Sequence, residues 1–197
     1  MITSPIDPAA EIALAVDAYR QGNDVEELLG RLDEIARASS VDALIVATEP
    51  FRDIPEVAGP IYETIVAREP ENARALVVLA NAYWLSGRGP EAVEQLATRA
   101  IASDPGQRGA WHLWALAESN PRARTERWRQ VTERFPTDDL ARATLADNAT
   151  SLAGAEHDRD ALALAIKTYR ELLVTATHPE QRSALERAIS TLESWKL

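Results

Sequence analysis

The stretch from Pro70 to Pro105 places the strongest limit on what this chain can fold into. It holds two apolar patterns with the period of an α-helix, separated by two glycines and Pro90, a residue suited to a first helical position. In the first pattern Leu76, Leu79 and Tyr83 share one face and should be buried. Two short helices joined by a tight turn form an antiparallel hairpin, and one hairpin buries little apolar surface alone. The stretch therefore predicts a hairpin that needs neighbours.

Similar patterns recur on both sides of this stretch. Prolines at positions 70, 105, 136 and 179 are separated by 35, 31 and 43 residues, and each follows one expected helix and precedes another. A drifting period of this length is typical of stacked helix pairs, which need a closing element at the end. We therefore predict one all-α domain of antiparallel hairpins. The expected units are residues 7–38, 39–70, 71–105, 106–136 and 137–178, followed by a capping helix at 179–196.

Two segments in the N-terminal third have less regular patterns. Asn23 followed by Glu26 fits a helix N-cap, with the amide accepting a backbone hydrogen bond. Farther on, Pro60 would remove one hydrogen bond from a helix that began near residue 53. We therefore expect a turn at 53–58 and a helix at 60–69, with a single kinked helix as the alternative.

The C-terminal part contains long polar and apolar alternations with fewer prolines. We expect helices near 138–152 and 159–176, joined by a polar turn from Gly154 to Asp158. Thr177 with Glu180 resembles a capping box at the start of the last helix.

Residues 70–105 resemble the tetratricopeptide repeat, whose pattern is W-x₂-L-G-x₂-Y…A-x₃-F…P. The resemblance implies a right-handed superhelix of stacked hairpins whose concave surface binds peptides or helices of other proteins. The neighbouring residues 106–136 match less fully, and the outer segments mainly in hairpin shape. The matching positions are Leu76, Leu79, Ala80, Tyr83, Ala92, Leu96 and Pro105 in the first stretch, and Trp111, Trp128 and Pro136 in the second.

The same resemblance implies which side chains line the groove. We expect Arg74, Val77, Asn81 and Trp84 there, joined by His112 from the next repeat. Asn81 would hydrogen-bond a ligand backbone, because an amide offers a donor and an acceptor together; the alternative is a solvated polar residue. His112 and Ala143 lie near positions where a carboxylate clamp wants lysine, so such a clamp is not expected. Core filling is the interpretation for two other tryptophans, Trp128 and Trp195.

The net charge of −10 is unevenly spread. Residues 1–70 hold 14 acidic and 5 basic side chains, whereas residues 71–136 hold 7 and 9. An acidic chain repels phosphate backbones, so nucleic-acid binding is not expected. The asymmetry allows a second hypothesis, a self-associating homo-oligomer that joins its acidic third to its basic middle. Four arginines of that middle, at 122, 124, 127 and 129, could bind an acidic partner or form a solvated face neutralised by Glu126 and Glu133.

Chemical motifs are scarce. The chain has no cysteine, its three histidines are far apart, and no G-x-x-x-x-G-K-[ST], H-E-x-x-H or G-x-S-x-G pattern occurs. No apolar run reaches the length of a membrane span, and the first residues do not resemble a signal peptide. We therefore expect a cytoplasmic, non-enzymatic scaffold for a protein or peptide partner, without metal or cofactor. A helical enzyme is the third hypothesis, and it would require a deep polar pocket.

Overall fold

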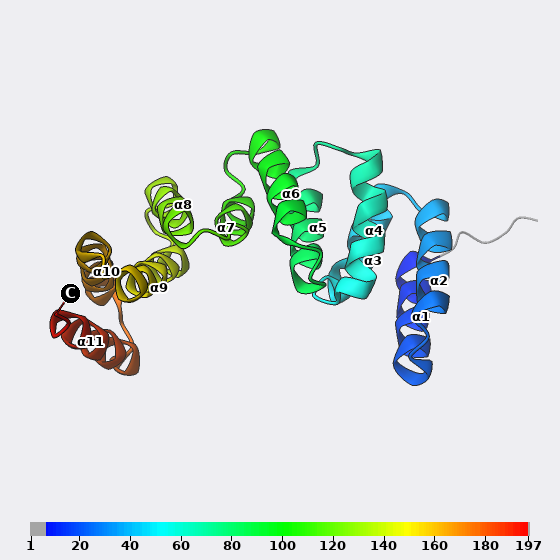
Figure 1. Cartoon of the computed structure of the whole chain (residues 1–197). Helices are drawn as coiled ribbons and strands as arrows, with labels where there is room; N and C mark the ends of the chain where they lie inside the picture. The colour runs from blue at the N-terminus through cyan, green and yellow to red at the C-terminus, as the bar shows by residue number, and fades with distance from the viewer. Residues whose placement is uncertain (1–6, 197) are drawn as a thin grey trace, which may run out of the picture. The chain divides into compact units, whose positions relative to one another are not determined.

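The computed structural model describes residues 7–196, which form α-helices and one short 3₁₀ helix, with no strand among them (Figure 1). They belong to two compact units: unit 1 ends at Leu113 and unit 2 begins at Trp114, inside α7. That the whole chain is one domain stays a prediction. The helices are α1 (Pro8–Gly22), α2 (Val25–Ala38), α3 (Val41–Thr48), η1 (Glu49–Phe51), α4 (Pro55–Arg68), α5 (Ala73–Leu85), α6 (Pro90–Ser103), α7 (Arg108–Leu116), α8 (Pro121–Arg134), α9 (Asp139–Glu156), α10 (Arg159–Thr175) and α11 (Pro179–Glu193).

Unit 1 is a row of helix pairs in which each pair packs on the next. α1 contacts α2 and α3, α4 contacts α2, α3 and α5, and α5 contacts α6. The buried residues of α1, α3 and α5 keep one register: Ile12, Leu44 and Leu76 are fully buried and 32 residues apart. The residues three and four positions later are buried in all three helices, namely Ala15 and Val16, Ala47 and Thr48, and Leu79 and Ala80. Unit 1 is thus more regular than the proline spacing indicates.

Unit 2 is built around α9, which packs between α8 and α10, while α11 covers α10. One buried cluster joins Ala149, Ala165 and Leu192 from the last three helices, and Trp195 packs against it. Trp128 of α8 is also buried. The core role predicted for Trp128 and Trp195 is confirmed, and α11 closes this end of the unit as expected of a capping helix.

The expected turn at 53–58 is wrong, because α4 is one helix from Pro55 to Arg68 with Pro60 inside it. Pro60 removes one hydrogen bond, but Val57 and Ala58 of the first turn are fully buried, which favours the helical path. A proline also clashes with the Cβ of the residue before it in a helix, and here that residue is Gly59, which has none. A methyl group at Gly59 would meet no atom within 4 Å, so close packing does not explain this glycine.

Three other predictions about helix ends are wrong; two are described here, and the third concerns the start of α11. Asn23 is not the N-cap of α2: it ends α1 in the left-handed conformation, and Asp24 caps α2 by accepting from the Glu27 N–H. The Asn side chain tolerates that conformation well, which explains the assignment. The polar turn expected from Gly154 begins only at His157, because Leu152 and Ala153 are buried and Trp195 lies 3.5 Å from a methyl group built at Gly154.

The capping box expected at Thr177 is absent from the described structure of α11. The helix begins at Pro179, so its N-cap is His178, which makes no side-chain capping hydrogen bond. Thr177 stands one position too early for the reciprocal bonds with Glu180. Other helices are capped by their N-cap side chains: Ser40 accepts from the Ala43 N–H, and Asn120 from the Ala123 N–H.

Candidate partner-binding surface

Helix α5 has one buried face and one open face. Asn72 caps it, with Oδ1 accepting from the Ala75 N–H at 3.0 Å. Leu76 and Leu79 are buried as predicted, and α5 packs between α4 and α6. The predicted groove residues Arg74, Val77, Asn81 and Trp84, here called the α5 surface, lie outside this buried stripe.

The open face of α5 carries an unusual amount of apolar area at its C-terminal end. Trp84 keeps 40% of its surface exposed and the adjacent Leu85 keeps 52%. Arg74 is exposed at the other end, while Val77 and Asn81 between them are half-buried. A large aromatic ring beside an aliphatic side chain and an amide offers the residue types that protein interfaces favour.

Tyr83 fixes the last turn of α5 and thereby the position of Trp84. Its hydroxyl donates to Glu63 Oε1 of α4 at 2.9 Å, and the Arg88 guanidinium lies 4.5 Å from the ring centroid. Arg88 also pairs with Glu63 at 2.9 Å. Burial, and then the hydrogen bond to Glu63, raise the pKa of Tyr83. The ring is half-buried rather than buried as predicted, because its polar end reaches this ion pair.

Arg74 connects the α5 surface to the helix pair before it. Its Nη2 lies 3.6 Å from Glu49 Oε2, and Glu49 also pairs with Arg52 at 3.1 Å. Burial, and then the charge of Glu49, raise the pKa of the phenol of Tyr62, which lies beneath them. The first turn of α5 therefore lies beside the end of α3.

Val77 and His112 mark where α7 approaches α5 within unit 1. A methyl group built at Gly109 would lie only 3.2 Å from Cγ1 of Val77, so α7 passes close to this part of the α5 surface. His112 follows Gly109 by three residues and is half-buried on α7. That Val77 and His112 contact a partner stays a prediction.

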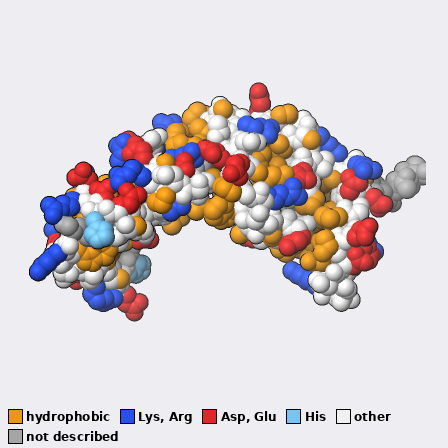
Figure 2. All heavy atoms as spheres, in the orientation of Figure 1, with side chains coloured by type: hydrophobic (Ala, Val, Ile, Leu, Met, Phe, Trp, Pro, Cys, Tyr) orange, Lys and Arg blue, Asp and Glu red, His pale blue; other side chains and the backbone are white. Residues whose placement is uncertain are grey.

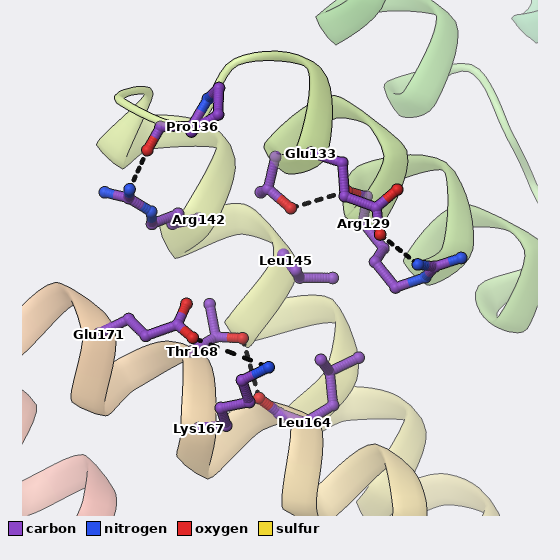
Figure 3. Close-up of a pocket in the computed structure, with 10 residues that line it drawn as sticks. Arg129, Glu133, Pro136, Arg142, Leu145, Leu164, Lys167, Thr168 and Glu171 are labelled. Atoms are coloured by element: carbon purple, nitrogen blue, oxygen red, sulfur yellow. Dashed lines mark hydrogen bonds and ion pairs between the residues drawn. The ribbon is translucent and has the colours of Figure 1, made fainter.

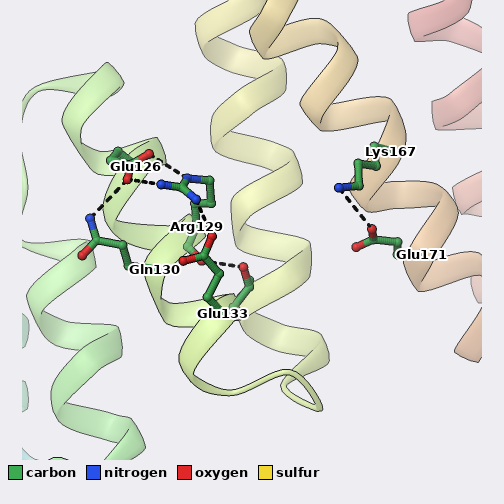
Figure 4. Close-up of polar contacts among 7 residues, drawn as sticks. Glu126, Arg129, Gln130, Glu133, Lys167 and Glu171 are labelled. Atoms are coloured by element: carbon green, nitrogen blue, oxygen red, sulfur yellow. Dashed lines mark hydrogen bonds and ion pairs between the residues drawn. The ribbon is translucent and has the colours of Figure 1, made fainter.

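The four arginines of α8 are used within unit 2. Arg122 pairs with Glu156 and Asp158, and Arg124 donates to Asn148 Oδ1 at 2.8 Å. Arg127 pairs with Glu118 at 2.9 Å and lies 4.6 Å from the Trp114 ring centroid. Figure 4 shows the fourth, Arg129, held between Glu126 and Glu133 on the same helix. The interpretation as a face neutralised by its own carboxylates is confirmed for Arg129.

A hollow of about 340 Å³ lies between α8, α9 and α10 (Figure 3). Its floor is formed by Leu145, Leu164 and Thr168, and charged side chains stand around its rim. Of those, Lys167 faces Glu171 at 3.9 Å and Arg142 pairs with Asp139 at 2.7 Å. The residues that line it include no histidine, serine or cysteine, so the hollow lacks the nucleophile–base pair that many hydrolases use.

Other site types are scarce in the part of the chain that the structure describes. Among residues 7–196, no three His, Asp or Glu side chains come together as metal ligands would. No helix in that range combines the length and apolar character that a membrane crossing requires.

Comparisons with known proteins identify the fold. Residues 55–116, from α4 to the end of α7, match the tetratricopeptide repeat family. No curated protein sequence matches the chain.

Several solved structures match nearly the whole chain. MamA superposes with a TM-score of 0.62 at 17% identity, covering 82% of this chain and 96% of that one. TTC0263, a thermophilic TPR protein of Thermus thermophilus, gives 0.54 at 16% identity, covering 95% and 100%. The pilF protein of Pseudomonas aeruginosa gives 0.52 at 17% identity, covering 96% and 93%. The predicted all-α fold of tetratricopeptide-like helix pairs is thus confirmed.

Proposed function

Because the chain is a tetratricopeptide-like helical-repeat protein, we propose that it is a scaffold whose α5 surface holds a segment of a partner protein. Proteins of this kind bind protein partners rather than catalyse reactions. The observation that carries the proposal is the exposed pair Trp84 and Leu85 at the end of a helix whose other face is buried. Tryptophan is enriched among the residues that supply most of the binding energy at protein interfaces.

The geometry around Trp84 supports binding without a large rearrangement. The bonds from Tyr83 to Glu63 and from Arg88 to Glu63 tie the end of α5 to α4. A partner that covers Trp84 then loses little entropy in ordering the protein side of the interface. Asn81, one turn before Trp84 and Leu85, offers both a donor and an acceptor to the backbone of a bound segment.

Recovery of partners from an extract of the source organism tests this proposal. The full chain, Asn81→Ala, Trp84→Ala and the control Val174→Ala would be immobilised, and the bound proteins would be identified and quantified by mass spectrometry. Val174 is a suitable control because it is 84% exposed on α10 and belongs to unit 2, whereas α5 belongs to unit 1. We expect the same partner on wild type and on the Val174 variant, reduced about tenfold by Trp84→Ala.

The recovered partner would then be purified and titrated against all four proteins. Thermal melting first establishes that the variants are folded, since Asn81 and Trp84 lie outside the buried stripe. Equal affinity for wild type, Asn81→Ala and Trp84→Ala would overturn the α5 surface as the binding site.

A further inference from the structure

The register shared by α1, α3 and α5 aligns their open faces as well as their buried ones. Two residues after each of the buried Ile12, Leu44 and Leu76 stands another aliphatic side chain. Leu14 is 58% exposed, Val46 is 74% exposed, and Val78 is half-buried. We call these three the apolar row.

A second row runs beside the first. Three residues after each member of the apolar row stands a side chain with oxygen acceptors, and residues three apart share a helix face. This acceptor row consists of Asp17, Glu49 and Asn81. Asn81, the central polar group of the α5 surface, is therefore one position in a series whose other two members are carboxylates.

The packing of unit 1 brings the rows of successive helices together. α1 packs on α3, and Arg74 in the first turn of α5 lies 3.6 Å from Glu49, the residue that follows α3. Packed helix axes lie about 8–10 Å apart. A polyproline II segment has three residues per turn and rises about 3.1 Å per residue, so every third side chain faces the same way after about 9 Å, roughly one helix spacing.

Charge identifies what could lie across these rows. Residues 1–113 carry 18 acidic and 9 basic side chains, a net charge of −9. The arginines next to the acceptor row pair with it through exposed contacts: Arg20 lies 3.6 Å from Asp17, and Arg52 and Arg74 lie 3.1 Å and 3.6 Å from Glu49. Such exposed pairs contribute little to stability, so an incoming cation can exchange for them. Figure 2 shows acidic side chains set among hydrophobic ones on the visible surface of unit 1.

We propose that the apolar and acceptor rows of α1, α3 and α5 bind a basic segment of another protein in the polyproline II conformation, with an apolar side chain at every third position. This rests on the proposed function and extends the binding site from the α5 surface to α3 and α1. The apolar side chains lie on Leu14, Val46 and Val78, and lysine or arginine side chains between them approach the acceptor row.

Synthetic peptides test the spacing directly on the full chain. One fluorescent peptide repeats the triplet Leu-Lys-Ser, and a second has the same composition with its leucines at every second position. Fluorescence anisotropy gives both dissociation constants at low and at high salt. We expect the triplet peptide to bind at least about tenfold more tightly, and its affinity to fall as salt rises. Equal binding of the two peptides, or affinity independent of salt, would overturn the inference.

Matched variants then locate the peptide. Leu14→Ser and Val46→Ser change exposed side chains without adding charge, so both proteins should fold, and Val174→Ser is the control on α10. We expect each row variant to weaken the triplet peptide about tenfold and the control to leave it unchanged. If Trp84→Ala weakens binding while Val46→Ser has no effect, the α5 surface remains the binding site and the proposal that the rows bind the peptide is overturned. If all variants bind alike, both proposals fail.

Discussion

The two units differ most in how they carry charge. Residues 1–113 have a net charge of −9, whereas residues 114–197 hold 13 acidic and 12 basic side chains, a net of −1. In unit 2 arginines join different helices: Arg122 links α8 to α9, and Arg170 pairs with Glu193 to link α10 to α11. In unit 1 the pairs of α1 and α2 stay within one helix, as for Arg31 with Glu27, whereas Arg74 with Glu49 and Arg88 with Glu63 join different elements.

This difference indicates two uses of the same helix-pair architecture. Ion pairs between helices restrain their packing, and a nearly balanced unit exerts little long-range attraction. Unbalanced carboxylates on exposed faces add little to stability but attract a basic partner and speed its association. We therefore interpret unit 1, which carries the unbalanced carboxylates, as the recognition unit.

The largest expected effect concerns the two faces of α5 in unit 1. Leu76→Ala removes a fully buried side chain and should lower the free energy of unfolding by about 2–5 kcal/mol. Trp84→Ala, on the open face, should change it by less than about 1 kcal/mol. Urea unfolding followed by circular dichroism measures both. A large loss for Trp84→Ala would mean that the ring supports the fold, against its assignment to the α5 surface.

The next effect tests whether arginine pairs hold unit 2 together. The Arg127 and Glu118 side chains are only 17% and 18% exposed, and Arg127 also donates to the Trp114 carbonyl at 2.8 Å. Arg127→Ala leaves a shielded carboxylate and should cost about 2 kcal/mol. The control Arg129→Ala removes a more exposed cation and should cost less than about 1 kcal/mol. Similar losses in urea unfolding would contradict the distinction between joining and surface pairs.

Salt should act on the two units in opposite directions. Screening weakens repulsion among the excess carboxylates of unit 1, and it also weakens the arginine pairs of unit 2. Hydrogen exchange measured at low and high salt should show amide protection rising in α1–α4 and falling in α8–α10, by about 0.5 kcal/mol each. Amide protection that changes in the same direction in both units would contradict the proposed difference between them. Light scattering on the same samples tests self-association through charge, which predicts a molecular mass that falls as salt rises.

The smallest effect is the titration of Asp158 in unit 2. The backbone N–H of Ala161, and then the Arg122 side chain, hold the pKa of Asp158 below its usual 3.8. A lowered pKa in the folded protein stabilises it above pH 3.8, and that contribution is lost as the pH falls through the folded value. In an NMR titration, Arg122→Ala should raise the pKa of Asp158, whereas Arg129→Ala should not. If the pKa of Asp158 is unchanged in Arg122→Ala, the Arg122 side chain does not contribute to lowering that pKa.

Local patterns predicted most of the helices because helix limits depend on nearby residues. Pro90 stands at the first position of α6 as expected, since a first-turn proline acts within one turn. The predicted turn at 53–58 was wrong because the cost of a proline inside a helix is outweighed here. Val57 is buried, and Gly59 has no Cβ to clash with Pro60. Such compensation depends on tertiary packing, which periodicity does not contain.

The sequence predicted which face of α5 is buried and which is open, but not the contacts that fix the end of the helix. Helix geometry alone separates Leu76 and Leu79 from Asn81 and Trp84. The contact of Tyr83 with Glu63 joins residues 20 positions apart, so no local pattern indicated it. The exact interval of 32 residues was visible in the sequence, but spacing measured between prolines hid it, because prolines mark helix ends and loop lengths vary.

The interval of 32 residues also makes part of unit 1 transferable. Ser40 and Asn72 are 32 residues apart, and each caps the helix that follows it by accepting from the backbone N–H three residues on. A segment from Val41 to Asn72 therefore begins and ends at equivalent points of the backbone. Duplicating it in tandem would keep every cap and add one step to both rows, so the length of the recognised segment becomes a quantity that can be engineered in whole repeats.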